Sequence, residues 1–443
     1  MGIKIILLII FFAVMAAVGI YSRRHVTSVD GFVLGGRSVG PWLTAFAYGT
    51  SYFSAVVFVG YAGQFGWKYG IASTWIGIGN ALIGSLLAWV VLGRRTKVMT
   101  QHLGSRTMPD FFGERYKSKS LKITASVIVF VFLIPYTASV YNGLSRLFAM
   151  AFNIPYTWCV VTMAAFTALY VILGGYMATA INDFIQGIIM LIGIVAVIAA
   201  VLNGQGGFMN AIAEMAKIPS DVPLTQGQPG AFTSFFGPDP VNLLGVVLLT
   251  SLGTWGLPQM IGKFYAIKDE KSISTGTIIS TIFAIIISGG CYFLGGFGRL
   301  FDSPEIYDKA GGAVVYDSII PHMLSMLPDL LIGVVVVLVL SASMSTLSSL
   351  VLTSSSTLTL DLLKDNIMKN VLIGIAAGIA IGYVLRKMED DGKFKCIHDD
   401  MSELADRAKK KIKDVVDKGV NEAEYIGDRV EHITDKVKKG ATN

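Results

Sequence analysis

Hydroxyl side chains gather at helical spacing in the apolar segment 328–361. Ala342, Ser345 and Thr346 stand at positions i, i+3 and i+4, which places them on one face of a helix. Sodium is a hard cation that takes oxygen ligands, as calcium and magnesium do. The two hydroxyl groups and the Ala342 carbonyl therefore suit a cation site inside a membrane. The alternative is that the hydroxyls only bond their own helix or join two helices.

A second stretch of chain, in the apolar segment 41–66, could also supply oxygen ligands for a cation. The apolar segment 41–66 carries glycine and hydroxyl residues from Ala47 to Ser54, and glycine makes local unwinding easier. Thr50 and Phe53 flank the expected break. Their carbonyls are candidate ligands, because backbone groups freed at membrane depth must line a cavity or lie buried in protein.

Asp183 is an acidic residue near the start of the apolar segment 180–202. A carboxylate that faces lipid is costly, so Asp183 is a candidate functional residue. The alternative is an interfacial acid in the first helical turn, which the helix dipole favours. Residue spacing leaves both interpretations open.

The apolar segment 241–262 is the third one with helix-breaking residues, namely Gly253, Gly256 and Pro258. Glycine-interrupted segments at corresponding places in two halves of a chain point to a carrier with its site at the membrane midplane. Three aromatic residues could face a solute, although packing is the ordinary role of such side chains: Tyr52 and Trp255 near these breaks, and Tyr136 after Pro135, which interrupts its own segment.

Composition places the 443-residue chain in a bilayer, since 53% of the residues are hydrophobic and a further 48 are glycines. The predicted spans of mainly apolar residues are 3–21, 41–66, 71–93, 122–150, 155–174, 180–202, 241–262, 274–300 and 328–361. The three cysteines and five histidines show no metal-ligand spacing, and no nucleophile stands beside a base. We therefore expect no enzyme.

Lysine and arginine collect in cytoplasmic loops. The basic residues counted in two such loops are Arg94, Arg95, Lys97, Arg106, Arg115, Lys117 and Lys119, then Lys263, Lys268 and Lys271. The long segment 203–240 has only Lys217. This pattern predicts an N-terminus outside the cell and a multi-pass protein of the cell membrane.

The chain changes character near its end. Residues 1–364 form the predicted transmembrane domain, 365–386 a short apolar helix, and 387–443 a charged amphipathic helical tail. The tail is either a solvated helix without its own function or a segment for self-association or for attachment to a surface.

Five stretches, in the same order along the chain, resemble the sodium/solute symporter family, which includes proline, pantothenate, galactose and sialic-acid carriers. They are Gly31–Gly40, Met108–Tyr116, the segment around Asp183, Gly253–Pro258 and Ser341–Ser349. The resemblance implies an all-α polytopic membrane protein with the LeuT-like inverted-repeat fold. It also implies Na⁺ as the coupling ion, and we expect the lipid bilayer and a small organic solute, but no nucleic acid, as partners.

The resemblance also implies roles for individual residues. The main sodium site would comprise Thr50, Phe53, Ala342, Ser345 and Thr346. A second sodium site, found in some members, would comprise Asp183, Ser345, Ser348 and Ser349, so that coupling to two sodium ions is an option. The positions near the solute would be Ser54, Tyr136, Thr254, Trp255, Gly256 and Pro258, with Tyr52 beside them.

Two departures from the family pattern bear on function. Proline carriers have an aspartate at the position of Tyr52. The second repeat also stops after three helices, which suggests a truncation after the eighth core helix. Sequence therefore predicts a sodium-coupled symporter that imports an amino acid or a carboxylate by alternating access. The alternative is a truncated member that binds a ligand or partner without transport.

Overall fold

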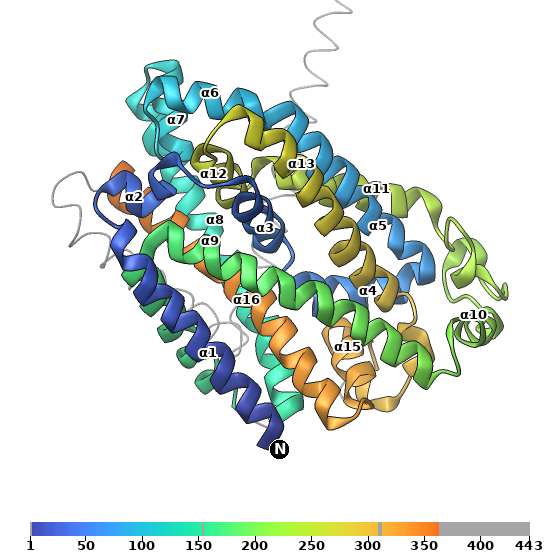
Figure 1. Ribbon diagram of the computed structural model, residues 1–443. Helices are drawn as coiled ribbons and strands as arrows, with labels where there is room; N and C mark the ends of the chain where they lie inside the picture. The colour runs from blue at the N-terminus through green and yellow to red at the C-terminus, as the bar shows by residue number, and fades with distance from the viewer. Residues whose placement is uncertain (1, 153–154, 309–311, 363–443) are drawn as a thin grey trace, which may run out of the picture. The chain divides into compact units, whose positions relative to one another are not determined.

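A computed structural model describes residues 2–152, 155–308 and 312–362 of the chain (Figure 1). The predicted segments 365–386 and 387–443 lie outside these residues. The sixteen α-helices of the described part are α1 Gly2–Ser22, α2 Val29–Leu34, α3 Pro41–Tyr52, α4 Ala62–Tyr69, α5 Thr74–Gly79, α6 Arg94–Leu103, α7 Met108–Tyr116, α8 Lys119–Phe152, α9 Tyr156–Gly204, α10 Phe208–Lys217, α11 Pro240–Gly253, α12 Pro258–Ala266, α13 Glu270–Ala284, α14 Gly290–Gly295, α15 Tyr316–Ser325 and α16 Asp329–Ser356.

Wider, π-helical turns continue several of these helices. They are Val56–Tyr61, Asn80–Leu87, Trp89–Gly93, Ile285–Gly289 and Thr357–Leu362. The extended pairings described between residues 2 and 362 are two isolated bridges, Val39 with Ile267 and Tyr307 with Val314. The described part is therefore helical, as predicted.

Six of the described helices are long and apolar enough to cross a membrane, or seven if one bent pair counts as a span. Two of the six, Val56–Leu103 and Thr157–Gly204, have 48 residues each, or about 72 Å at 1.5 Å per residue. That length is more than twice the hydrocarbon thickness of a bilayer. Each contains one glycine with a positive φ and non-helical backbone angles, Gly70 with φ 61° and Gly175 with φ 52°. The helical path breaks at these glycines, where the sequence predicts the end of one span and the start of the next.

The first predicted break lies between α3 and the turns that follow it. Helix α3 ends at Tyr52, and Phe53 has the non-helical angles φ −87° and ψ 87°. The Ser54 hydroxyl then accepts a hydrogen bond from the Val56 amide at 3.2 Å. A side-chain acceptor at this place satisfies an amide that the new helix start leaves free. The break predicted in 41–66 is thus present.

The second predicted break separates α11 from α12 by an angle of 51°. Leu257 is extended, with φ −74° and ψ 117°, and Pro258 is the first residue of α12. A residue before proline avoids the helical region, and proline suits the first helical position because its missing amide needs no partner there. Thr254, Gly256 and Pro258, at this bend, line a cavity described below.

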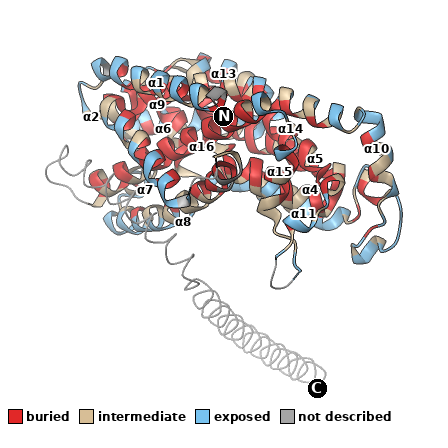
Figure 2. Cartoon of the chain, turned by 90° about the horizontal axis from the view of Figure 1, so that it is seen from below, coloured by how far each residue is buried: buried red, intermediate tan, exposed pale blue. Residues whose placement is uncertain are grey.

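Helix α16 runs through the interior and packs against α9, α8 and α3 (Figure 1). Nearly all its side chains from Leu338 to Leu352 are buried, whereas much of α10 is exposed (Figure 2). Large apolar side chains are exposed on α1 and α8, among them Ile9 and Phe132. Exposed apolar helix faces of this kind suit contact with lipid.

Two helices meet without side chains between them. A Cβ atom added to Gly66 of α4 would lie 2.0 Å from the Gly295 carbonyl oxygen of α14, and one added to Gly295 would lie 2.1 Å from the Ala62 carbonyl oxygen. Gly77 of α5 likewise faces the backbone of Gly289, at 2.6 Å. Glycine is required here because it lets two backbones approach closely.

A Gly66→Ala change is expected to lower the free energy of unfolding by about 1–3 kcal/mol, the usual effect of overpacking. The clash is with a backbone oxygen, so no rotamer change relieves it. The midpoint of thermal unfolding in detergent micelles measures the effect. Gly245→Ala in α11 is the matched control, since a Cβ there meets nothing within 4 Å. A Gly66→Ala midpoint as high as that of Gly245→Ala would contradict the prediction.

Candidate cation and solute sites

Oxygen atoms from the end of α3 and from the middle of α16 meet in the interior. The Ser345 hydroxyl donates to the Thr50 carbonyl at 3.1 Å, and the Thr346 hydroxyl donates to the same oxygen at 3.2 Å. Both hydroxyls also lie 3.1 Å from the Ala342 carbonyl of their own helix. All three side chains with hydroxyl groups are fully buried. The structure thus brings Thr50, Ala342, Ser345 and Thr346 together, as the sequence predicts.

Phe53, the remaining predicted ligand of this set, lies close by. It lines a small cavity of about 10 Å³ together with Ser54 and Ala342. A cavity of that size holds about one water-sized sphere. The break at Phe53 therefore borders a small, mainly apolar space that also touches Ala342 of the oxygen cluster.

The residues predicted for a second sodium site are also buried, but they have other partners. Ser348 donates to the Ser345 carbonyl at 2.9 Å. The Ser349 hydroxyl lies 2.8 Å from the Ser51 hydroxyl. The Asp183 side chain is fully buried inside α9. A place in the first turn of a helix at the interface, the alternative for Asp183, is therefore wrong.

A lysine stands among these residues. The Lys263 ammonium donates to the Ser349 hydroxyl at 3.0 Å and lies 3.6 Å from an Asp183 carboxylate oxygen. The Lys263 side chain is 3% exposed and that of Asp183 is 0% exposed. The prediction that counted Lys263 as a cytoplasmic loop residue is wrong, because α12 continues past it to Ala266. Lys97, counted in the other loop, is likewise buried, in α6.

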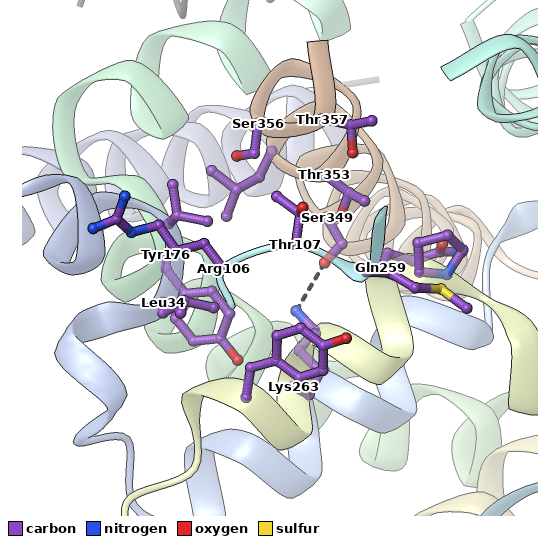
Figure 3. A pocket seen from close by; sticks show the side chains of 16 residues that line it. Leu34, Arg106, Thr107, Tyr176, Gln259, Lys263, Ser349, Thr353, Ser356 and Thr357 are labelled. Atoms are coloured by element: carbon purple, nitrogen blue, oxygen red, sulfur yellow. Dashed lines mark hydrogen bonds between the residues drawn. The ribbon is translucent and has the colours of Figure 1, made fainter. Parts of the chain in front are cut away.

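A cavity of about 50 Å³ reaches the Lys263 ammonium (Figure 3). Tyr176 and Gln259 line it near the lysine, and hydroxyl residues of α16 and its continuation line its other wall. Figure 3 shows the bond from Lys263 to Ser349 pointing across this space. Ser349, one of the residues predicted for a second sodium site, thus borders a small cavity lined by both hydroxyl and apolar side chains.

Charged residues of α7, α8 and the π-helical turn Thr357–Leu362 after α16 form a network at the Thr107 side of this cavity. Thr107 donates to the Asp361 carboxylate at 2.6 Å. Lys122 pairs with Asp361 at 3.2 Å and with Asp110 at 2.5 Å. The sequence stretch Met108–Tyr116 is thereby fixed to the end of the central helix. Asp361 was not among the predicted site residues.

A larger cavity of about 550 Å³ lies between α3, α8 and the broken α11–α12 pair. Its volume falls within the range of about 300–1,000 Å³ that is usual for small-molecule sites. Most of its wall is apolar, with a few hydroxyl groups. Its lining includes these predicted solute residues: Tyr52, Ser54, Tyr136, Thr254, Gly256 and Pro258.

Trp255, the other predicted solute residue, does not line this cavity. Its indole N–H donates to the Ile83 carbonyl at 3.0 Å, and Thr254 beside it donates to the Gly84 carbonyl at 3.1 Å. The Asn80 amide oxygen accepts hydrogen bonds from Thr250 and from Ser251, each at 3.1 Å. Trp255 thus anchors the broken segment to the π-helical turns Asn80–Leu87, which belong to the predicted span 71–93. Asn80 was not predicted, because a lone amide in an apolar span gives no signal of its partners.

The chain matches known proteins over most of its length. The profile of the Sodium:solute symporter family matches residues 32–372. Sodium/proline symporter 2 of Staphylococcus saprophyticus subsp. saprophyticus is 32% identical over 371 residues, which are 81% of this chain and 68% of that protein. The sodium/proline symporter of Staphylococcus aureus strain JH9 is 31% identical over 370 residues, with the same two shares.

A solved structure agrees with the fold. A Na⁺-coupled sialic acid symporter in a substrate-bound outward-open state superposes with a TM-score of 0.73 at 15% identity, over 89% of this chain and 82% of that one. At this identity the agreement concerns the fold alone, and the chain is an all-helical polytopic membrane protein with the LeuT-like arrangement. The profile match and the relative at 32% identity place it in a transporter family rather than among enzymes: the chain belongs to the sodium:solute symporter family.

Proposed function

We propose that the chain is a sodium-coupled symporter that imports a small organic solute across the cell membrane by alternating access. The observation that carries the proposal is the convergence of the Ser345 and Thr346 hydroxyls on the Thr50 carbonyl. Neutral oxygens from two distant stretches of chain are the donor set that a hard monovalent cation takes. Sodium would bind among these oxygens and the carbonyls of Phe53 and Ala342.

The 550 Å³ cavity is the proposed solute site. It borders both helix breaks, where free backbone groups and the positive end of α12 can bind a polar or anionic part of a solute. Its apolar wall suits a compact aliphatic part. An amino acid or a carboxylate fits this combination, and the sodium/proline symporters among the relatives favour the same class.

Sodium binding would be coupled to solute binding because two helices, α3 and α16, share the cation. Sodium would hold the broken helix α3 against α16, and Ser54, next to the break, lines the solute cavity. A bound ion thus favours the conformation that binds solute. Linkage of this kind is typically worth about 1–3 kcal/mol, or a 5- to 150-fold change in affinity. The positive charges at Lys268, Lys271 and the 94–119 segment support an N-terminus outside the cell.

Uptake into proteoliposomes tests the proposal. The purified full chain is reconstituted and loaded with potassium buffer, and labelled proline, other small amino acids and short carboxylates are added outside with either sodium or choline chloride. At least one solute is expected to accumulate only under the inward sodium gradient. Equal uptake in both salts would overturn the proposal. Sodium-dependent binding of a solute without accumulation would instead support a member that binds but does not transport.

A further inference from the structure

A positive charge of the protein itself lies where a second cation would bind. The Lys263 ammonium contacts the Ser349 hydroxyl at 3.0 Å and faces the Asp183 carboxylate at 3.6 Å. Its third neighbour is the ring of Tyr176, whose centroid is 5.2 Å from the nitrogen. A hydroxyl, a carboxylate and an aromatic face are all favourable neighbours for a buried cation. Two of these three residues, Asp183 and Ser349, are those expected to hold sodium.

Charge balance argues against an additional ion at this position. The Asp183 carboxylate and the Lys263 ammonium together carry no net charge, and both side chains are buried. A sodium ion added beside them would bring an unbalanced charge among side chains that are at most 3% exposed, next to an ammonium that repels it. Removal of the ammonium would leave the carboxylate unbalanced, and the carboxylate would then favour a cation.

We propose that the Lys263 ammonium is a tethered cation that takes the place of a second sodium ion, so that the carrier binds one Na⁺ per cycle. This proposal rests on the proposed function, because it presumes the sodium site at Thr50. In this arrangement each broken helix is held to α16 by a cation. Sodium joins α3 to α16, and the ammonium of α12 joins α16 and α9 through Ser349 and Asp183.

The two cations differ in one respect that matters for function. Sodium can leave its site and be released with the solute, whereas Lys263 is covalently part of α12. The Lys263 ammonium therefore supplies the electrostatic attraction that a second sodium ion would provide. The transport cycle gains no free energy at this position, because no second Na⁺ moves down its gradient. The proposal predicts that the second site becomes a sodium site when the tether is removed and the carboxylate is kept.

The test counts bound sodium ions and needs no knowledge of the solute. Equilibrium binding of ²²Na⁺ is measured on the purified full chain in detergent, with choline as the replacing cation. The wild type and Lys263→Arg are expected to bind about one ion per chain at saturation, and Lys263→Met about two, because the methionine has a similar length but no charge. The double variant Asp183→Asn with Lys263→Met is expected to return to about one, because the second site then lacks its carboxylate.

Each result bears on one proposal or the other. No saturable sodium binding by the wild type would overturn the proposed function. Two ions on the wild type, or one ion on Lys263→Met, would overturn the tether while leaving sodium coupling intact. Sodium should also raise the thermal midpoint of Lys263→Met more than that of the wild type, relative to choline. A Lys263→Met protein that folds in neither salt would count against the tether, since sodium should be able to replace the ammonium.

Discussion

Replacing Ser345 by alanine is expected to weaken sodium binding by about ten- to a hundredfold. The Ser345 hydroxyl is one of two that meet the Thr50 carbonyl in the interior. A polar contact to a charged group is worth about 1.5–3 kcal/mol, and 1.4 kcal/mol corresponds to a factor of ten. Removal of both hydroxyls in the double variant Ser345→Ala with Thr346→Ala should abolish saturable ²²Na⁺ binding.

A neighbouring serine provides the matched control. Ser343 is equally buried in α16, but its hydroxyl donates to the Val339 carbonyl of the same helix at 2.7 Å. Ser343→Ala removes the same atom from the same helix without touching α3, so sodium affinity should stay at the wild-type value. An equal loss of affinity in Ser343→Ala and Ser345→Ala would show that the effect comes from α16 in general. The proposed site would then be wrong.

Asp183→Asn is expected to destabilise the protein by about 3–5 kcal/mol, the usual result of leaving one partner of a buried ion pair alone. The Lys263 ammonium would remain buried with the Ser349 hydroxyl as its remaining polar contact at bonding distance. The free energy of unfolding in mixed micelles, measured in choline chloride without sodium, gives the size of the loss. The double variant Asp183→Asn with Lys263→Met should recover most of it, because no unbalanced charge remains.

An exposed ion pair provides a control, which distinguishes the cost of burying an unpaired charge from the ordinary loss of a salt bridge. Lys217 and Glu214 are 2.6 Å apart on α10, closer than Asp183 and Lys263, but their side chains are 69% and 45% exposed. Glu214→Gln should therefore cost less than about 1 kcal/mol. If the double variant were no more stable than Asp183→Asn alone, burial of an unpaired charge would not be the cause of the loss.

The features that sequence predicts best are those with local causes. The break at Phe53 follows from glycine and serine residues within one helical turn, and the break at Leu257 follows from the proline after it. The shared face of Ser345 and Thr346 follows from their spacing alone. The approach of Thr50 to that face is a long-range contact, and it was predictable only because the family resemblance places the two segments together.

The position and contacts of Lys263 could not be predicted because they depend on where a helix continues after a bend. In the sequence, Lys263 stands shortly before Lys268 and Lys271 and looks like the charged flank of a span. In the structure, the 51° bend at Leu257 directs α12 along the interior, and the lysine meets residues from two distant helices. No local pattern encodes either contact.

The contact of Trp255 could not be predicted from the sequence either. Its position inside a broken segment suggests a solute contact, but a carbonyl of the π-helical turns at Ile83 accepts its N–H. A π-helical turn shifts the register of backbone bonds, and such turns are frequent at functional sites. Sequence gives little indication of where these turns occur, so the acceptor for the indole was not foreseeable.

The glycine contacts between α4 and α14, and between α5 and the turn at Gly289, restrict how the carrier can move. Backbones that touch at Gly66 and Gly295 have no compressible layer between them. Sliding by even a fraction of a helical turn would push a larger neighbouring residue against a carbonyl group. Under the proposed alternating access these helices would consequently move together as one block, and a gate would open at a boundary of that block rather than through its middle.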